Sequence, residues 1–110
     1  SCQAQAQTVV IYARADAAQA QRARDLASTY GPTIIDRDLT PGVAWRPAMA
    51  SAICAADVVL LVWSARAAAS SELRREIDAA LVCRRAIIPV MLDSTALPGM
   101  IADINAVDWR

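Results

Sequence analysis

The sequence contains no histidine, no lysine and no phenylalanine among its 110 residues. Without histidine the chain lacks the commonest general base and metal ligand, which excludes Ser-His-Asp and Cys-His catalysis. The three cysteines, Cys2, Cys54 and Cys83, are too far apart in the sequence to form a zinc site. We therefore predict that the protein holds no metal ion and carries no cofactor.

Glycine is also scarce, and the net charge is zero. Only three glycines are present, and none belongs to a GxGxxG or P-loop pattern, which excludes a glycine-rich phosphate cradle. Eleven basic and eleven acidic residues cancel, which argues against nucleic acid as a partner and against electrostatic attachment to membranes. The longest strongly apolar run, residues 58–63, is too short to cross a bilayer, so we expect no membrane segment in this chain.

The cysteines bear on the cellular compartment. Cys54 and Cys83 lie in apolar helical contexts, so we interpret them as small core residues rather than reactive thiols. Unpaired cysteines and the absence of a secretory signal pattern indicate a reducing, cytoplasmic location. The first residue is serine rather than methionine, so we expect the chain to be part of a longer protein.

The sequence does contain an alternation of two hydrophobic patterns. Short apolar runs predict strands at residues 8–13, 33–36, 58–63, 86–92 and 105–109. Amphipathic stretches predict helices at residues 17–30, 47–54 and 70–84, and a helical turn at 99–103. Asp16 is the expected N-cap of the first helix, and Pro89 is expected to remove a hydrogen bond from the fourth strand. The Gln/Ala-rich residues 1–7 are interpreted as a linker or tail.

This alternation predicts the fold. Strands that alternate with helices form a parallel sheet with helices on both faces, and for five strands we expect the flavodoxin-like order 2-1-3-4-5 in one domain over residues 8–110. Ligands bind such sheets outside the carboxyl ends of the strands, at the switch between the first and third strands. That rim comprises residues 13–16, 37–45, 64–70 and 93–98. A phospho-accepting receiver domain shares this fold but needs a lysine, which the chain lacks.

The helix predicted at residues 70–84 carries the best candidate for chemistry. Its apolar stripe consists of Leu73, Ile77, Ala80 and Leu81. Glu72 and Glu76 lie one turn apart on the flank of that stripe. A carboxylate in a partly dry cleft can orient sugar hydroxyls and stabilise the positive charge that develops on a ribose ring. The ordinary alternative is a surface glutamate paired with a neighbouring arginine, and spacing alone favours that alternative.

Several segments occur in an order and spacing typical of one family. They are residues 9–16, 36–42 with Trp45, 56–64, 71–81, 87–93 and 106–110. Together these segments resemble a Toll/interleukin-1 receptor (TIR) domain of the bacterial type over almost the whole chain. The resemblance implies a protein-interaction module, and many members of that family also cleave NAD+ at the nicotinamide–ribose bond.

The resemblance also implies roles for individual residues. The catalytic glutamate of the family lies in the helix after the third strand, which corresponds to Glu76. Substrate contacts are implied for Asp38 and Trp45, which would line the nicotinamide or ribose pocket. Arg14 would meet a phosphate, and Ser64, which ends the third strand beside the same rim, would also contact the substrate. Each of these four residues has a structural alternative, such as a solvated loop side chain.

The partners follow from the same resemblance. The self-association loop of the family corresponds to Asp38, Leu39, Thr40, Pro41, Gly42 and Val43. The implied partners are NAD+ as substrate, a second TIR domain, and a fused or associated sensor domain. Two positions depart from the family pattern, because Glu72 replaces a frequent tryptophan and Ile11 replaces a serine.

Three functional hypotheses remain from the sequence. The first is a TIR-domain NAD+ glycohydrolase that yields nicotinamide and ADP-ribose, or a cyclic ADP-ribose, and is activated by self-assembly in signalling or defence. The second is a non-enzymatic adaptor that acts through homotypic TIR contacts. The third is an enzyme similar to nucleoside 2-deoxyribosyltransferases, which share the fold and the glutamate chemistry.

Overall fold

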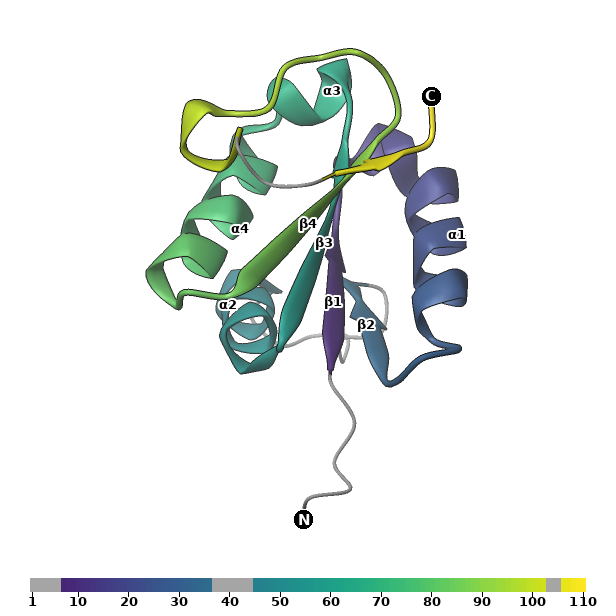
Figure 1. Ribbon diagram of the computed structural model, residues 1–110. Helices are drawn as coiled ribbons and strands as arrows, with labels where there is room; N and C mark the ends of the chain where they lie inside the picture. Colours follow the sequence, from purple (N-terminus) through teal and green to yellow (C-terminus); the bar gives the residue numbers. More distant parts are fainter. Residues whose placement is uncertain (1–6, 37–44, 103–105) are drawn as a thin grey trace.

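The computed structural model describes residues 7–36, 45–102 and 106–110, and its described strands form one parallel sheet (Figure 1). The strands are β1 Thr8–Ile11, β2 Thr33–Ile35, β3 Val58–Trp63, β4 Ala86–Met91 and β5 Val107–Asp108. Their order in the sheet is β2-β1-β3-β4-β5, and every pairing is parallel. The predicted flavodoxin-like order is therefore confirmed.

Helices cover both faces of this sheet. α1, Ala17–Ala27, lies on one face, whereas α2, Trp45–Ala55, and α4, Ser71–Val82, lie on the other (Figure 1). Three short elements complete the described chain: η1 Arg14–Asp16, α3 Ala65–Ala68 and η3 Gly99–Ile101. Within the described residues, no helix combines the length and the apolar character needed to cross a membrane.

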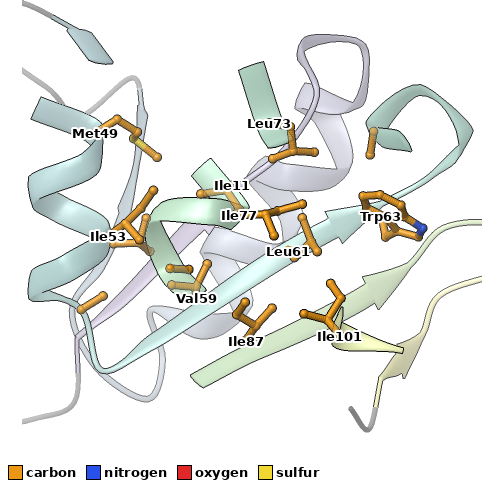
Figure 2. Close-up of a cluster of buried hydrophobic side chains, with 14 of the residues drawn as sticks. Ile11, Met49, Ile53, Val59, Leu61, Trp63, Leu73, Ile77, Ile87 and Ile101 are labelled. Atoms are coloured by element: carbon orange, nitrogen blue, oxygen red, sulfur yellow. The ribbon is translucent and has the colours of Figure 1, made fainter. Parts of the chain in front are cut away.

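The core is divided by the sheet into two clusters. Successive strand residues point to opposite faces, so Val59 and Leu61 pack toward α2 and α4, whereas Val62 packs toward α1. The larger cluster lies under α2 and α4, where Ile53 and Ile77 meet the sheet (Figure 2). β3 is buried on both faces, which explains why its apolar run is continuous rather than alternating.

α4 is fixed at both ends by local interactions. The Ser70 hydroxyl oxygen accepts a hydrogen bond from the Leu73 backbone N–H at 3.1 Å, which caps the first turn. After the last turn, Arg84 adopts a left-handed conformation with φ 56°, and the Arg85 N–H reaches back to the Ala80 carbonyl at 2.9 Å. The apolar stripe, with Leu73, Ile77 and Ala80, is buried against the sheet.

Pro89 lies inside β4 without interrupting its pairing to β3. The Leu92 N–H donates to the Trp63 carbonyl at 2.9 Å, so alternate backbone nitrogens of this strand point toward β3. By that alternation the Pro89 nitrogen points away from β3. On that side, β5 pairs with Val90 and Met91 only, so the missing N–H falls where β5 forms no described pair. Pro89 therefore leaves the ladder to β3 intact, which the sequence pattern did not indicate.

One local prediction is wrong and another is confirmed only in part. Residues 65–68 were expected in a loop but form α3, a four-residue helix too short to show a hydrophobic period. Asp16 occupies the N-cap position of α1, as predicted, but makes no capping hydrogen bond, because its carboxylate is buried and bonded elsewhere. The predicted tail, residues 1–7, lies outside the described residues except for Gln7, whose N–H donates to Asp57 Oδ2 at 2.7 Å.

The interpretation of the cysteines is also corrected. Cys54 near the end of α2 and Cys83 just after α4 form a disulfide, with their Cα atoms 5.4 Å apart. Both side chains are half-buried rather than fully enclosed in the core. Their pairing depends on the packing of α2 against α4, which no sequence spacing reveals. The inference of a reducing compartment, which relied on unpaired cysteines, loses that support.

Candidate active site

A pocket of about 280 Å³ opens where the carboxyl ends of β1 and β2 meet the start of α4. Its walls are Val10, Ile11, Tyr12, Arg14, Asp36, Met49, Ser70, Glu72, Leu73 and Glu76. The pocket lies at the rim where a sheet of this order is expected to bind ligands. It brings together two of the residues expected at the site, Arg14 and Glu76.

Glu76 is the most perturbed group in this pocket. Its side chain follows the apolar stripe of α4 into the core boundary, and only 9% of the residue is exposed. Burial raises the pKa of Glu76 to about 8, and the nearby carboxylates of Glu72 and Asp36 add to this increase. The carboxyl of Glu76 is thus largely protonated at neutral pH, and a cationic ligand would favour its ionised form.

A tyrosine and an aspartate line the same pocket as Glu76. The Tyr12 hydroxyl donates a hydrogen bond to Asp36 Oδ1 at 2.6 Å, which holds that carboxylate in a fixed position. Both residues follow the last residue of their strand, β1 and β2 respectively. Neither residue was predicted as part of the site. Their positions at the carboxyl ends of neighbouring strands were the available signal.

Ser64 lies elsewhere, in a polar cluster between η1 and α3. Its hydroxyl donates to Asp16 Oδ2 at 2.5 Å, and its oxygen accepts from the Ala67 N–H at 3.1 Å. Arg66 Nη1 lies 3.2 Å from Asp16 Oδ1. Asp16 is fully buried and Ser64 is 2% exposed, so the hydroxyl expected to meet substrate is committed to a structural contact. Ser64 is not part of the pocket wall.

The other predicted site residues belong to the segment between β2 and α2. Asp38 and the rest of the loop at 38–43 lie outside the described residues. Trp45 begins α2, but its side chain is outside the described part of the structure. Their expected roles in substrate binding and self-association stay predictions.

A family model for the TIR domain matches residues 9–110 of the chain. The chain belongs to the TIR domain family. Its fold is similar to the TIR domain of the Toll-related receptor TRR-2 from the lower metazoan Hydra magnipapillata, with a TM-score of 0.80 and 20% sequence identity. The match covers 93% of this chain and 82% of the Hydra chain, and at this identity the likeness concerns the fold alone. A search of curated proteins finds no match.

This TIR domain contains a second, apolar pocket of about 170 Å³ between α2 and α4. We call it the α2–α4 groove, and its walls are Arg46, Met49, Ala50, Ile53, Glu72, Arg75, Glu76 and Ala79. Met49, Glu72 and Glu76 also line the first pocket, so the two hollows share a wall. Glu76 therefore separates a polar compartment from an apolar one, an arrangement that the sequence analysis did not anticipate.

Proposed function

We propose that this TIR domain is an NAD+ glycohydrolase in which Glu76 is the catalytic carboxylate. The observation that carries the proposal is the burial of Glu76 in a pocket at the carboxyl ends of the strands, with its pKa raised to about 8. Strongly perturbed carboxyl groups in clefts are concentrated at functional sites. Membership in the TIR family adds support, since it includes NAD+-cleaving members among its signalling modules.

The proposed reaction breaks the bond between the nicotinamide nitrogen and ribose C1′. Nicotinamide leaves with the bonding electron pair, and positive charge develops on the ribose ring. The Glu76 carboxylate stabilises that charge and orients a ribose hydroxyl, while Glu72 and Asp36 add negative potential. Water then forms the new C1′–O bond and releases a proton to solvent, which gives ADP-ribose. An adenine nitrogen in place of water gives a cyclic product.

Arg14 supplies the one cation that lines the first pocket among the described residues. Its exposed guanidinium is suited to the pyrophosphate of a dinucleotide, because arginine binds phosphate oxygens through paired N–H donors. The negative potential around Glu76 and the positive charge of Arg14 thus match opposite ends of the same substrate. Homotypic TIR assembly would supply the remaining walls.

The direct test is nicotinamide release from NAD+ by concentrated protein, measured by chromatography. Glu76→Gln is expected to lose activity by about a hundredfold or more, because it removes the charge that stabilises the transition state. Asp78→Asn is the matched control, since Asp78 is exposed on the same helix and lines neither pocket. Wild-type activity in Glu76→Gln, with an unchanged circular dichroism spectrum, would contradict the assignment of Glu76 as the catalytic carboxylate.

The second candidate is a non-enzymatic adaptor, which the position of Glu72 favours. Its carboxylate lines both hollows at the point where a stacking aromatic would hold a base. This alternative predicts concentration-dependent self-association, weakened by changes at Pro41 or Gly42, and no loss of NAD+ at any protein concentration. Sedimentation combined with the nicotinamide assay separates the two candidates.

A further inference from the structure

The α2–α4 groove is built from two matching helical stripes. On α2, residues 46, 49, 50 and 53 face the groove, and on α4, residues 72, 75, 76 and 79 do so. Each set follows the i, i+3, i+4, i+7 spacing of one helix face. The small side chains of Ala50 and Ala79 leave the space that larger residues would fill. The groove therefore exists because both of these positions are alanine.

The groove has an apolar interior and charged residues at one end. The disulfide joins α2 and α4 near their C-terminal ends, so Arg46 in the first turn of α2 lies toward the same end as Glu72. Met49, Ala50 and Ile53 provide the apolar wall of α2. A ligand with one apolar part and one charged part would satisfy both regions.

The charge at this end favours an anion. Arg46 and Arg75 line the groove and are exposed, and neither takes part in the ion pairs formed within the described residues. Glu72 contributes one negative charge against these two positive charges. The raised pKa of Glu76 keeps its carboxyl largely neutral at pH 7. Counted over the residues that line the groove, the net charge is thus positive at neutral pH.

The shape and side chains favour an aromatic ring. A volume of about 170 Å³ between two packed helices suits a single ring rather than a long chain. The thioether of Met49 makes favourable contacts with aromatic rings, and guanidinium groups stack on them. A carboxylate on the ring can accept hydrogen bonds from a guanidinium in the paired geometry that arginine prefers.

We propose that the α2–α4 groove binds a single aromatic ring that carries a carboxylate, with the ring between the helices and the carboxylate at Arg46 and Arg75. In the proposed hydrolysis, on which this extension rests, the ring is the pyridine base at the cleaved bond, beside Glu76. A pyridine-3-carboxylate base is then preferred over the corresponding carboxamide. The two arginines set that preference.

The test uses nicotinate and nicotinamide as probes, followed by NMR of the isotope-labelled Glu76→Gln protein. This variant removes hydrolysis from the experiment and keeps the shape of the groove. Nicotinate is expected to shift the amide signals of Ala50 and Ala79 and to bind more tightly than nicotinamide. The Arg46→Met, Arg75→Met double variant should weaken nicotinate binding about tenfold, because charge-assisted hydrogen bonds are lost.

Arg74→Met is the matched control, since Arg74 is exposed next to Arg75 but does not line the groove. It should leave nicotinate binding unchanged. Equal binding of the two probes, or an equal loss in Arg74→Met, overturns the proposal. If nicotinate binds as expected while the wild-type protein never cleaves NAD+, the binding proposal for the groove is supported and the proposed NAD+ hydrolysis is overturned. If the protein cleaves NAD+ but does not bind nicotinate, the enzyme stands and the groove proposal fails.

The pH dependence of binding offers a second measurement. The charged and titratable groups that line the two hollows together with Glu76 are Glu72, Arg75, Arg46, Tyr12, Arg14 and Asp36, and of these Glu72 and Asp36 raise the pKa of Glu76. Above pH 8 the Glu76 carboxylate is ionised and repels the anion. Nicotinate binding to the wild-type protein should therefore weaken from pH 7 to pH 9 more steeply than binding to Glu76→Gln. Identical pH profiles would contradict a ring held beside Glu76.

Discussion

Glu76 combines a position in the core boundary with a carboxyl group that the protein holds in its protonated form. Its pKa of about 8 means that the folded protein keeps a proton that the unfolded chain, with a pKa near 4.5, releases. The unfolding free energy therefore falls as the pH rises from about 4.5 to about 8. Glu76 thus lines the candidate site at a cost to stability that grows from about pH 4.5 upward, which is typical of functional residues.

Replacement of Glu76 by Gln is expected to stabilise the protein at pH 8.5 and to change stability little at pH 4.5. The gain should be on the order of 4 kcal/mol, because the variant no longer has to bury an ionised carboxylate. Urea denaturation of both proteins across this pH range measures the difference. A constant difference at all pH values would show that the pKa of Glu76 is not raised.

Asp16 is the other buried acid among the described residues, and its role is structural. Its carboxylate accepts the Ser64 hydroxyl and pairs with Arg66, which joins the chain after β1 to the chain after β3. Asp16→Asn should lower the unfolding free energy by about 1–3 kcal/mol, because a buried hydrogen-bonded ion pair is lost. Asp25→Asn, which removes an exposed charge beside Arg24, should change it by less than about 0.5 kcal/mol. Equal effects in thermal or chemical unfolding would refute this role.

At the scale of elements, α2 and α4 form the unit that carries the site. They line the groove together, pack over the same core cluster and are joined by the disulfide between Cys54 and Cys83. Apolar contacts with the sheet position each of the two helices. The covalent link adds a restraint at the end opposite the charged residues.

The Cys54→Ser, Cys83→Ser double variant should lower the unfolding free energy by about 2–4 kcal/mol, as expected for the loss of a disulfide that closes a loop of this size. A reductant should destabilise the wild-type protein to a similar extent and leave the double variant unaffected. Denaturation with and without reductant measures both effects. Thiol titration of the unreduced wild-type protein checks that the bond is present.

For the whole molecule, the sequence was sufficient for the fold and for two of the residues that line the first pocket, Arg14 and Glu76. The continuous apolar run of β3 and the apolar stripe of α4 are visible in the local sequence pattern. The order of such strands and helices along the chain predicts the topology of the sheet. The contacts that the sequence did not predict join distant residues, such as Tyr12 with Asp36 and Ser64 with Asp16. Such pairs depend on how the helices and strands pack together, and the hydrophobic periodicity of the sequence does not predict that packing.

The disulfide has a mechanical consequence for this molecule. Cys54 and Cys83 are 29 positions apart, and Glu76 lies between them. If the chain is pulled from its two ends, tension passes directly through the disulfide, and the segment between the cysteines carries none of the load. About 100 Å of extended chain is thereby withheld from stretching until the bond is reduced. The segment between the two cysteines, which contains Glu76, is thus not stretched when force is applied to the ends of the chain.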